Sequence, residues 1–157
     1  MKHSPEVRDI IVRSWLRYIG DLQRIMDSSA ERIERCKSLV NLSGVKYTGM
    51  PTDPNLYTDA LPDGIALLIE AQEDLVTIIG EYEAELNEAY AICHRPKLPE
   101  CEMLWDHYVE RMTWAKVGRK HGYAAKYVDE KAAQGIDAIY DALPERTVRN
   151  VWKENQE

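Results

Sequence analysis

Residues 5–41 read PEVRDIIVRSWLRYIGDLQRIMDSSAERIERCKSLVN, and this stretch decides the fold. It holds no proline after Pro5 and a single glycine, Gly20. Mostly apolar residues recur in it at alternating steps of four and three: Arg8, Val12, Trp15, Ile19, Leu22, Met26, Ser29, Ile33, Cys36 and Val40. Such steps place side chains along one helix face, as in the seam of a coiled coil. The pattern predicts one long helix, with Ser4 as its N-cap and Pro5 in its first turn.

A second stretch, residues 61–92, has the same spacing. Its seam residues are Leu61, Ile65, Leu68, Gln72, Leu75, Ile79, Tyr82, Leu86 and Ala89, followed by Cys93. Residues 42–60 between the two stretches are rich in Gly, Pro, Ser, Thr, Asn and Asp, a composition typical of a loop. Two helices of matched length joined by one loop predict a coiled-coil-like antiparallel hairpin over residues 1–96.

The two seams can be placed in register. Pairing Ile33 with Leu68 also places the polar Ser29 opposite the polar Gln72, and apolar residues then meet apolar residues elsewhere. Charge agrees with this pairing: residues 1–41 carry 8 Lys and Arg against 6 Asp and Glu, whereas residues 61–97 carry 2 against 8.

A second set of large side chains repeats every seven residues on the flanks of both predicted helices. The set is Ile11, Tyr18, Ile25 and Leu39 with Arg32 in the gap, and Ile69, Val76 and Tyr90 with Glu83 in the gap. A two-helix hairpin cannot bury both of its flanks by itself, so either the C-terminal part or a second chain must cover them. We expect a homodimer formed through the hairpin.

The C-terminal part predicts three further helices in a domain of residues 97–143, which makes the whole chain all-α. The first covers residues 101–110, the second runs from its N-cap Thr113 to His121, and the third spans residues 124–143. Gly122 supplies the turn between the last two. In the tail, residues 144–157, Val148, Val151 and Trp152 share one apolar helical face.

Residues 104–128 read LWDHYVERMTWAKVGRKHGYAAKYV. The Thr-Trp pair at 113–114 and the Gly-Tyr pair at 122–123 resemble the helix-turn-helix of sigma factor region four. Over about residues 10–143 the chain resembles the ArpU/RinA-type phage transcriptional regulators, which place a long helical hairpin before a sigma-like helix-turn-helix. Tyr47-Thr48-Gly49-Met50-Pro51 matches a loop element of that family.

The resemblance implies binding of double-stranded DNA. A helix-turn-helix presents its last helix to the major groove and the N-terminus of the preceding helix to phosphate. The DNA-contacting positions would be Thr113, Lys116, Arg119, Lys120, Ala125, Lys126, Asp129 and Glu130. Residues 111–131 hold 6 Lys and Arg against 2 acids, in a chain whose net charge is −7. The chain departs from the family pattern at Ala124, where a Ser cap is usual, and at His121 and Lys131, where apolar residues are usual.

The function expected from this resemblance is a phage or prophage transcriptional regulator of late or packaging genes. Two alternatives stay open. One is a sigma-like protein-interaction module that contacts RNA polymerase or another regulator without reading bases. The other is a DNA recogniser similar to a terminase small subunit.

Other classes are disfavoured by the sequence. Cys93, His94, Cys101 and His107 lack the paired spacing of a zinc site, and no phosphate loop or hydrolase motif occurs. We therefore expect no metal, no cofactor and no enzymatic activity. No apolar run could span a membrane, the N-terminus lacks a signal-peptide core, and three cysteines cannot all pair, so we expect a cytoplasmic protein.

Overall fold

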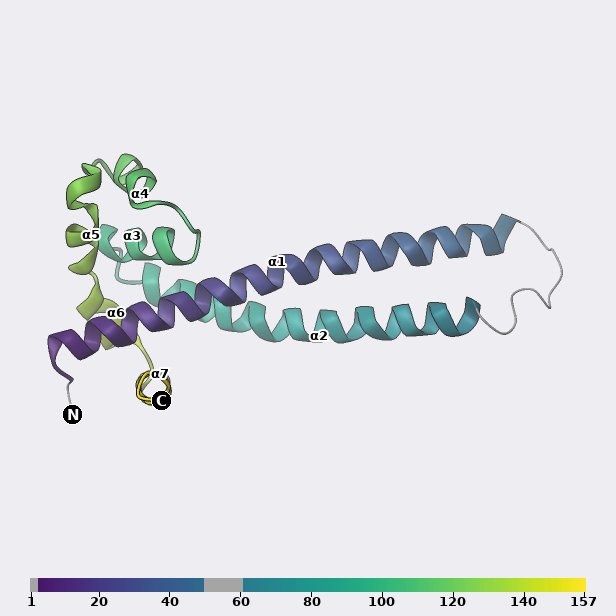
Figure 1. Ribbon diagram of the computed structural model, residues 1–157, viewed down its shortest axis with the longest axis horizontal. Coiled ribbons are helices and arrows are strands. Elements are labelled where there is room, and N and C mark those ends of the chain that lie inside the picture. The colour runs from purple at the N-terminus through teal and green to yellow at the C-terminus, as the bar shows by residue number, and fades with distance from the viewer. Residues whose placement is uncertain (1–2, 50–60) are drawn as a thin grey trace. The chain divides into compact units, whose positions relative to one another are not determined.

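The structure is a computed structural model that describes residues 3–49 and 61–157. In these ranges the chain forms helices and no strand, which confirms the all-α prediction (Figure 1). The helices are α1 (Pro5–Gly49), α2 (Leu61–His94), α3 (Pro99–Tyr108), α4 (Trp114–His121), α5 (Ala125–Ala133), α6 (Ile136–Ala142) and α7 (Glu145–Glu154). None of the helices in the described ranges is long and apolar enough to cross a membrane.

The chain divides into two compact units. Unit 1 comprises residues 1–23 and 85–157, and unit 2 comprises residues 24–84. This division differs from the predicted domain boundary after residue 96. The first turns of α1 and the last turns of α2 group with the C-terminal helices because they share a core, in which Leu16 and Cys93 are fully buried.

In unit 2, the second part of α1 and the first part of α2 run antiparallel (Figure 1). Ser29 and Ile33 of α1 are 7% and 8% exposed. Arg32 of α1 lines the same shallow hollow as Ala71 and Leu75 of α2, so these stretches lie side by side. The residue-by-residue register of the seams stays a prediction.

The predicted loop 42–60 is wrong in its first part, because α1 continues to Gly49. Composition overstated the loop here. A glycine inside a helix costs only about 1 kcal/mol relative to alanine, so Gly44 does not end α1. Proline disfavours the helical conformation of the residue before it, and the helix ends two residues before Pro51. Residues 50–60, with the Met50-Pro51 end of the family loop element, lie outside the described residues.

Unit 1 has a continuous apolar core. Its fully buried large side chains are Ile11, Val12, Leu16, Ile19, Cys93, Cys101, Met103, Leu104, Val109, Val117, Val128 and Ile139. Helices α3, α4 and α5 pack on one another, and α3 also packs on α6. Burial raises the pKa of the Cys93 thiol to about 12 and that of Cys101 to about 11, so both are neutral, apolar members of this core.

The predicted helix over residues 124–143 is wrong in one respect, because the structure divides it into α5 and α6. The break at Gln134 and Gly135 lies where the chain passes the start of α3. A Cβ atom on Gly135 would lie 2.9 Å from the backbone of Glu100 and Cys101. Tight backbone bonds from residues 134 and 135 to the carbonyls three residues earlier end α5.

The first helix of this region begins at Pro99, two residues before its predicted start, and ends at Tyr108. Proline is favourable in a first helical turn because its missing N–H would be unpaired there in any case.

The tail forms α7, in which Val148 is buried, and Trp152 packs beside His3 with ring centroids 5.9 Å apart. The tail is therefore part of unit 1.

Two glycines provide a matched test of the packing. In α4, a Cβ atom on Gly118 would lie 2.5 Å from the carbonyl oxygen of Tyr123, whereas a Cβ atom on Gly80 of α2 would meet nothing within 4 Å. We expect Gly118→Ala to lower the free energy of unfolding by about 1–3 kcal/mol, the usual cost of overpacking. Gly80→Ala should raise it by up to about 1 kcal/mol, because alanine favours helix. Urea denaturation monitored by circular dichroism measures both; equal effects would contradict the close approach at Gly118.

Candidate nucleic-acid interface

Helix α4 starts at the predicted N-cap. The Thr113 backbone is extended, with φ −65° and ψ 154°, and its hydroxyl accepts a hydrogen bond from the Lys116 backbone N–H at 3.3 Å. A capping hydroxyl pairs one of the donors that the first turn of a helix leaves unpaired. The structure thus confirms the cap at Thr113 and fixes the position of the first turn of α4.

A three-residue turn, residues 122–124, joins α4 to α5. Gly122 takes the left-handed conformation, with φ 82°, and donates its backbone N–H to the Gly118 carbonyl oxygen. Tyr123 donates its backbone N–H to the same carbonyl at 2.8 Å. A short turn containing glycine between two helices is typical of a helix-turn-helix. The missing side chain at Gly118 lets the turn approach α4 closely.

A buried carboxylate holds α4 against α3. The side chain of Asp106 is 6% exposed and accepts hydrogen bonds from Lys120 Nζ at 3.0 Å and from His121 Nε2 at 2.8 Å. The bond to Asp106 raises the pKa of Lys120. His121 is 11% exposed in its side chain, so the ring is a hydrogen-bonded part of the packing.

A second polar contact holds α5 against α1. Arg13 of α1 donates from Nη1 to Asp129 of α5 at 3.3 Å and to the Tyr108 hydroxyl of α3 at 2.7 Å, while its Nε donates to Asp9 at 2.9 Å. Burial disfavours the charged form of Arg13, but the bonds to Asp9 and Tyr108 outweigh it and raise its pKa. Asp129, predicted as a DNA-contacting position, is therefore engaged within the chain.

The predicted site residues gather on the α4–α5 pair. All eight are exposed: Thr113, Lys116, Arg119, Lys120, Ala125, Lys126, Asp129 and Glu130. On α5, Val128 and Ala132 are buried, and these define its inner face. The helical period then places Lys126 and Glu130 on the outer face, with Asp129 on the flank toward Arg13. We call Lys116, Arg119, Lys126, Tyr127 and Glu130 the α4–α5 surface.

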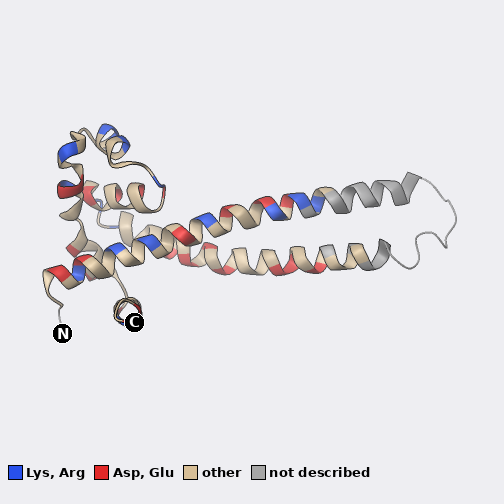
Figure 2. Cartoon of the chain, viewed as in Figure 1, with Lys and Arg blue, Asp and Glu red and all other residues tan. Residues whose placement is uncertain are grey.

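The basic residues of the α4–α5 region differ in whether they form an ion pair with a carboxylate. Lys120, Lys131 and Arg111 lie 3.0, 3.2 and 3.7 Å from carboxylate oxygens of Asp106, Glu100 and Asp21. Lys116 and Arg119 form no ion pair within residues 3–49 and 61–157. Figure 2 shows basic residues on α4. Lys116 and Arg119 keep their charge available to an anion.

Several residues that shape the site were not among the predicted positions. Tyr127 is 55% exposed, and Lys126 Nζ lies 5.6 Å from the centre of its ring. Tyr123 is 37% exposed, and Lys131 lies over it at 5.8 Å. The alternation of Tyr and Lys at 123–131 was a visible signal, since exposed aromatic rings among cations are typical of nucleic-acid surfaces. Arg13 carried no such signal.

The part of the chain that the structure describes contains no group of three or more His, Cys, Asp or Glu side chains arranged to hold a metal ion. The α4–α5 surface carries opposite charges on neighbouring exposed positions.

No protein-family model, no curated protein and no solved structure matches this chain.

The surroundings of the His107 ring on α3 predict that the stability of the protein depends on pH. The ring stacks on Trp114, with centroids 3.7 Å apart, and its Nδ1 donates to the Met112 carbonyl at 2.9 Å. Burial lowers the pKa of His107 below its ordinary value of 6.5. A lowered native pKa means that unfolding takes up a proton, so stability is complete above about pH 6.5 and is lost as pH falls through the native pKa.

We expect the free energy of unfolding to decline below about pH 6.5, and His107→Gln to remove part of that decline. Glutamine keeps an N–H donor for the Met112 carbonyl but cannot titrate. Denaturation at a series of pH values measures both proteins, with His94→Gln as the control for loss of a histidine outside this contact. If the free energy of unfolding of His107→Gln falls with pH as steeply as that of wild type, His107 is not the cause of the decline.

Proposed function

We propose that this chain is a DNA-binding transcriptional regulator of the phage type, with α4 and α5 as its helix-turn-helix. The observation that carries the proposal is the α4–α5 pair itself: a capped first helix, a three-residue turn with a left-handed glycine, and a second helix with an exposed outer face. The resemblance to ArpU/RinA-type regulators supports the regulator class and implies control of late or packaging genes.

In this proposal α4 contacts phosphate. Lys116 and Arg119 lie three residues apart, so they share one side of the helix. Both are exposed, and Lys116 follows the capped N-terminus of α4, whose backbone N–H groups favour anions. Such contacts supply affinity and orientation rather than sequence preference.

In the same proposal α5 enters the major groove. Lys126 and Glu130 are one turn apart on its outer face, where lysine can donate to guanine and glutamate can accept from cytosine N4. Arg13 neutralises Asp129, so this carboxylate repels phosphate less than its position alone suggests. Glu130 is left as the acidic residue that opposes nonspecific attraction and favours particular bases.

A protein-contact function is the second candidate, and one observation favours it. Three cations between Arg111 and Lys131 are already matched by carboxylates of the same chain. The net positive field of the region is therefore smaller than the sequence count implies, and the same surface would fit a protein partner such as RNA polymerase.

Binding to double-stranded DNA over a salt series tests the proposal. Wild-type protein should bind a mixed-sequence duplex at low salt, with log affinity falling linearly against log salt concentration. Lys116→Gln/Arg119→Gln removes two phosphate contacts and should reduce the magnitude of that slope by about two units.

The matched control is Arg149→Gln/Lys153→Gln, which removes the same charge from exposed positions on α7. This variant should keep most of the wild-type slope. An equal reduction of the salt slope in the two variants would show that DNA is attracted by the net charge alone and not by α4. No binding by wild type at low salt would contradict DNA binding and favour the protein-contact function.

The proposal includes a homodimer formed through unit 2. Large apolar side chains of its two helices are exposed there: Ile25, Leu67, Ile69, Val76 and Ile78. Residues 24–49 carry 5 Lys and Arg against 3 acids, whereas residues 61–84 carry 6 acids and no Lys or Arg. Figure 2 shows the acidic residues along α2. A second copy can bury these apolar flanks and set its acidic helix beside the basic one, forming a four-helix bundle.

Analytical ultracentrifugation tests the dimer. We expect a species of about 36 kDa, twice the 18.1 kDa chain mass. Ile69→Glu/Val76→Glu should shift it toward monomer, because charges replace apolar contacts in the interface. Thr77→Glu adds a charge at an exposed polar position beside Val76 and serves as the control. A monomeric wild type, or dissociation by Thr77→Glu alone, would contradict this interface.

A further inference from the structure

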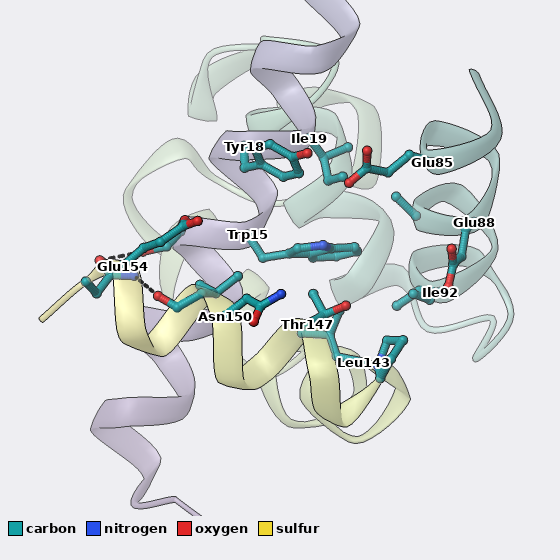
Figure 3. Close-up of a pocket in the computed structure, with 15 residues that line it drawn as sticks. Trp15, Tyr18, Ile19, Glu85, Glu88, Ile92, Leu143, Thr147, Asn150 and Glu154 are labelled. Atoms are coloured by element: carbon teal, nitrogen blue, oxygen red, sulfur yellow. Dashed lines mark hydrogen bonds between the residues drawn. The ribbon is translucent and has the colours of Figure 1, made fainter. Parts of the chain in front are cut away.

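Unit 1 contains a cavity of about 260 Å³ that no part of the DNA-binding proposal uses. Side chains of α1, α2 and α7 line it (Figure 3). In Figure 3 the ring of Trp15 extends from α1 toward α2, and Thr147 reaches toward it from α7. Ile92 and Leu143 add apolar surface to the wall. The cavity is small for a ligand site, so it fits a molecule of about the size of one substituted aromatic ring.

The charged residues that line this cavity are all acidic. Glu85 and Glu88 of α2 and Glu154 of α7 line it, and none of its lining residues is Lys, Arg or His. Within the described residues, these three carboxylates form no ion pair with a cation. Three carboxylates around one concave site produce a negative potential that favours a positive ligand.

Aromatic surface lies next to these carboxylates. Trp15 and Tyr18, on successive turns of α1, both line the cavity. Trp15 is 4% exposed, so its ring is held in place by packing, while Tyr18 is 46% exposed. The faces of aromatic rings attract ammonium and guanidinium groups, and tryptophan does so most strongly. Aromatic rings and carboxylates in one cavity are complementary to a cation that carries an apolar body.

We propose that this cavity binds a small organic cation: an ammonium or guanidinium group on an apolar body of about one ring. The apolar body lies against Trp15, Ile92 and Leu143, and the cation lies toward Glu85 and Glu88. The inference is independent of DNA binding, because it involves none of the residues of the α4–α5 surface.

Three probes of the same size separate charge from shape. Phenethylammonium carries the cation, 2-phenylethanol is its neutral counterpart, and phenylacetate is the anion. Titration of the isotope-labelled 157-residue chain, followed by amide chemical shifts, should give a dissociation constant on the order of 1 mM for phenethylammonium. The alcohol and the anion should bind at least about tenfold more weakly, which corresponds to losing one charge-assisted contact.

Variants locate the site. Glu85→Gln/Glu88→Gln should weaken phenethylammonium binding about tenfold. The control, Glu81→Gln/Glu83→Gln, removes the same charge from exposed positions of α2 outside the cavity. It should change the affinity less than about twofold. Thr147→Phe should abolish binding by filling the cavity while the circular dichroism spectrum and melting curve stay those of a folded protein.

Three results would overturn the proposal. The first is the absence of saturable binding of phenethylammonium. The second is equal affinity for the cation and the alcohol, which would indicate an apolar site without charge preference. The third is undiminished binding to folded Thr147→Phe, which would place the probe elsewhere on the protein.

Discussion

The guanidinium group of Arg13 joins three helices of unit 1, α1, α3 and α5. One side chain, 18% exposed, bonds to Asp9 of α1, to the Tyr108 hydroxyl of α3 and to Asp129 of α5. Charge-assisted hydrogen bonds of this kind have strict geometry, because the guanidinium is planar and its donors are fixed. The bonds to Tyr108 and Asp129 join α1 to α3 and to α5, whereas the bond to Asp9 lies within α1. Val128 and Ala132 define the buried face of α5, and the bond from Arg13 engages Asp129 on its flank.

Asp106 performs the corresponding task for α4. Burying a carboxylate is costly unless donors surround it, and Lys120 and His121 supply them. Lys131 is likewise held by Glu100 on α3. His121 and Lys131 are two of the positions at which the chain departs from the sigma-like pattern, where apolar residues are usual. At both positions a polar side chain bonds to a carboxylate of α3.

Local signals in the sequence were sufficient for part of this account. The cap at Thr113 and the turn at Gly122 depend on neighbouring residues, and the structure confirms both. The break at Gly135 was missed because it arises from close approach to α3, which no local pattern records. The bond between Arg13 and Asp129 joins residues 116 positions apart, so periodicity and composition carry no trace of it.

The most direct test of DNA binding by α4 and α5 is amide chemical-shift mapping. Isotope-labelled protein is mixed with a short mixed-sequence DNA duplex at low salt. We expect the largest shifts to fall on the α4–α5 surface, including Lys116, Lys126 and Tyr127, and to decline as salt is raised. Residues of α7 should stay unshifted. Shifts centred on another part of the chain, or no shifts at all, would contradict the claim that α4 and α5 bind DNA.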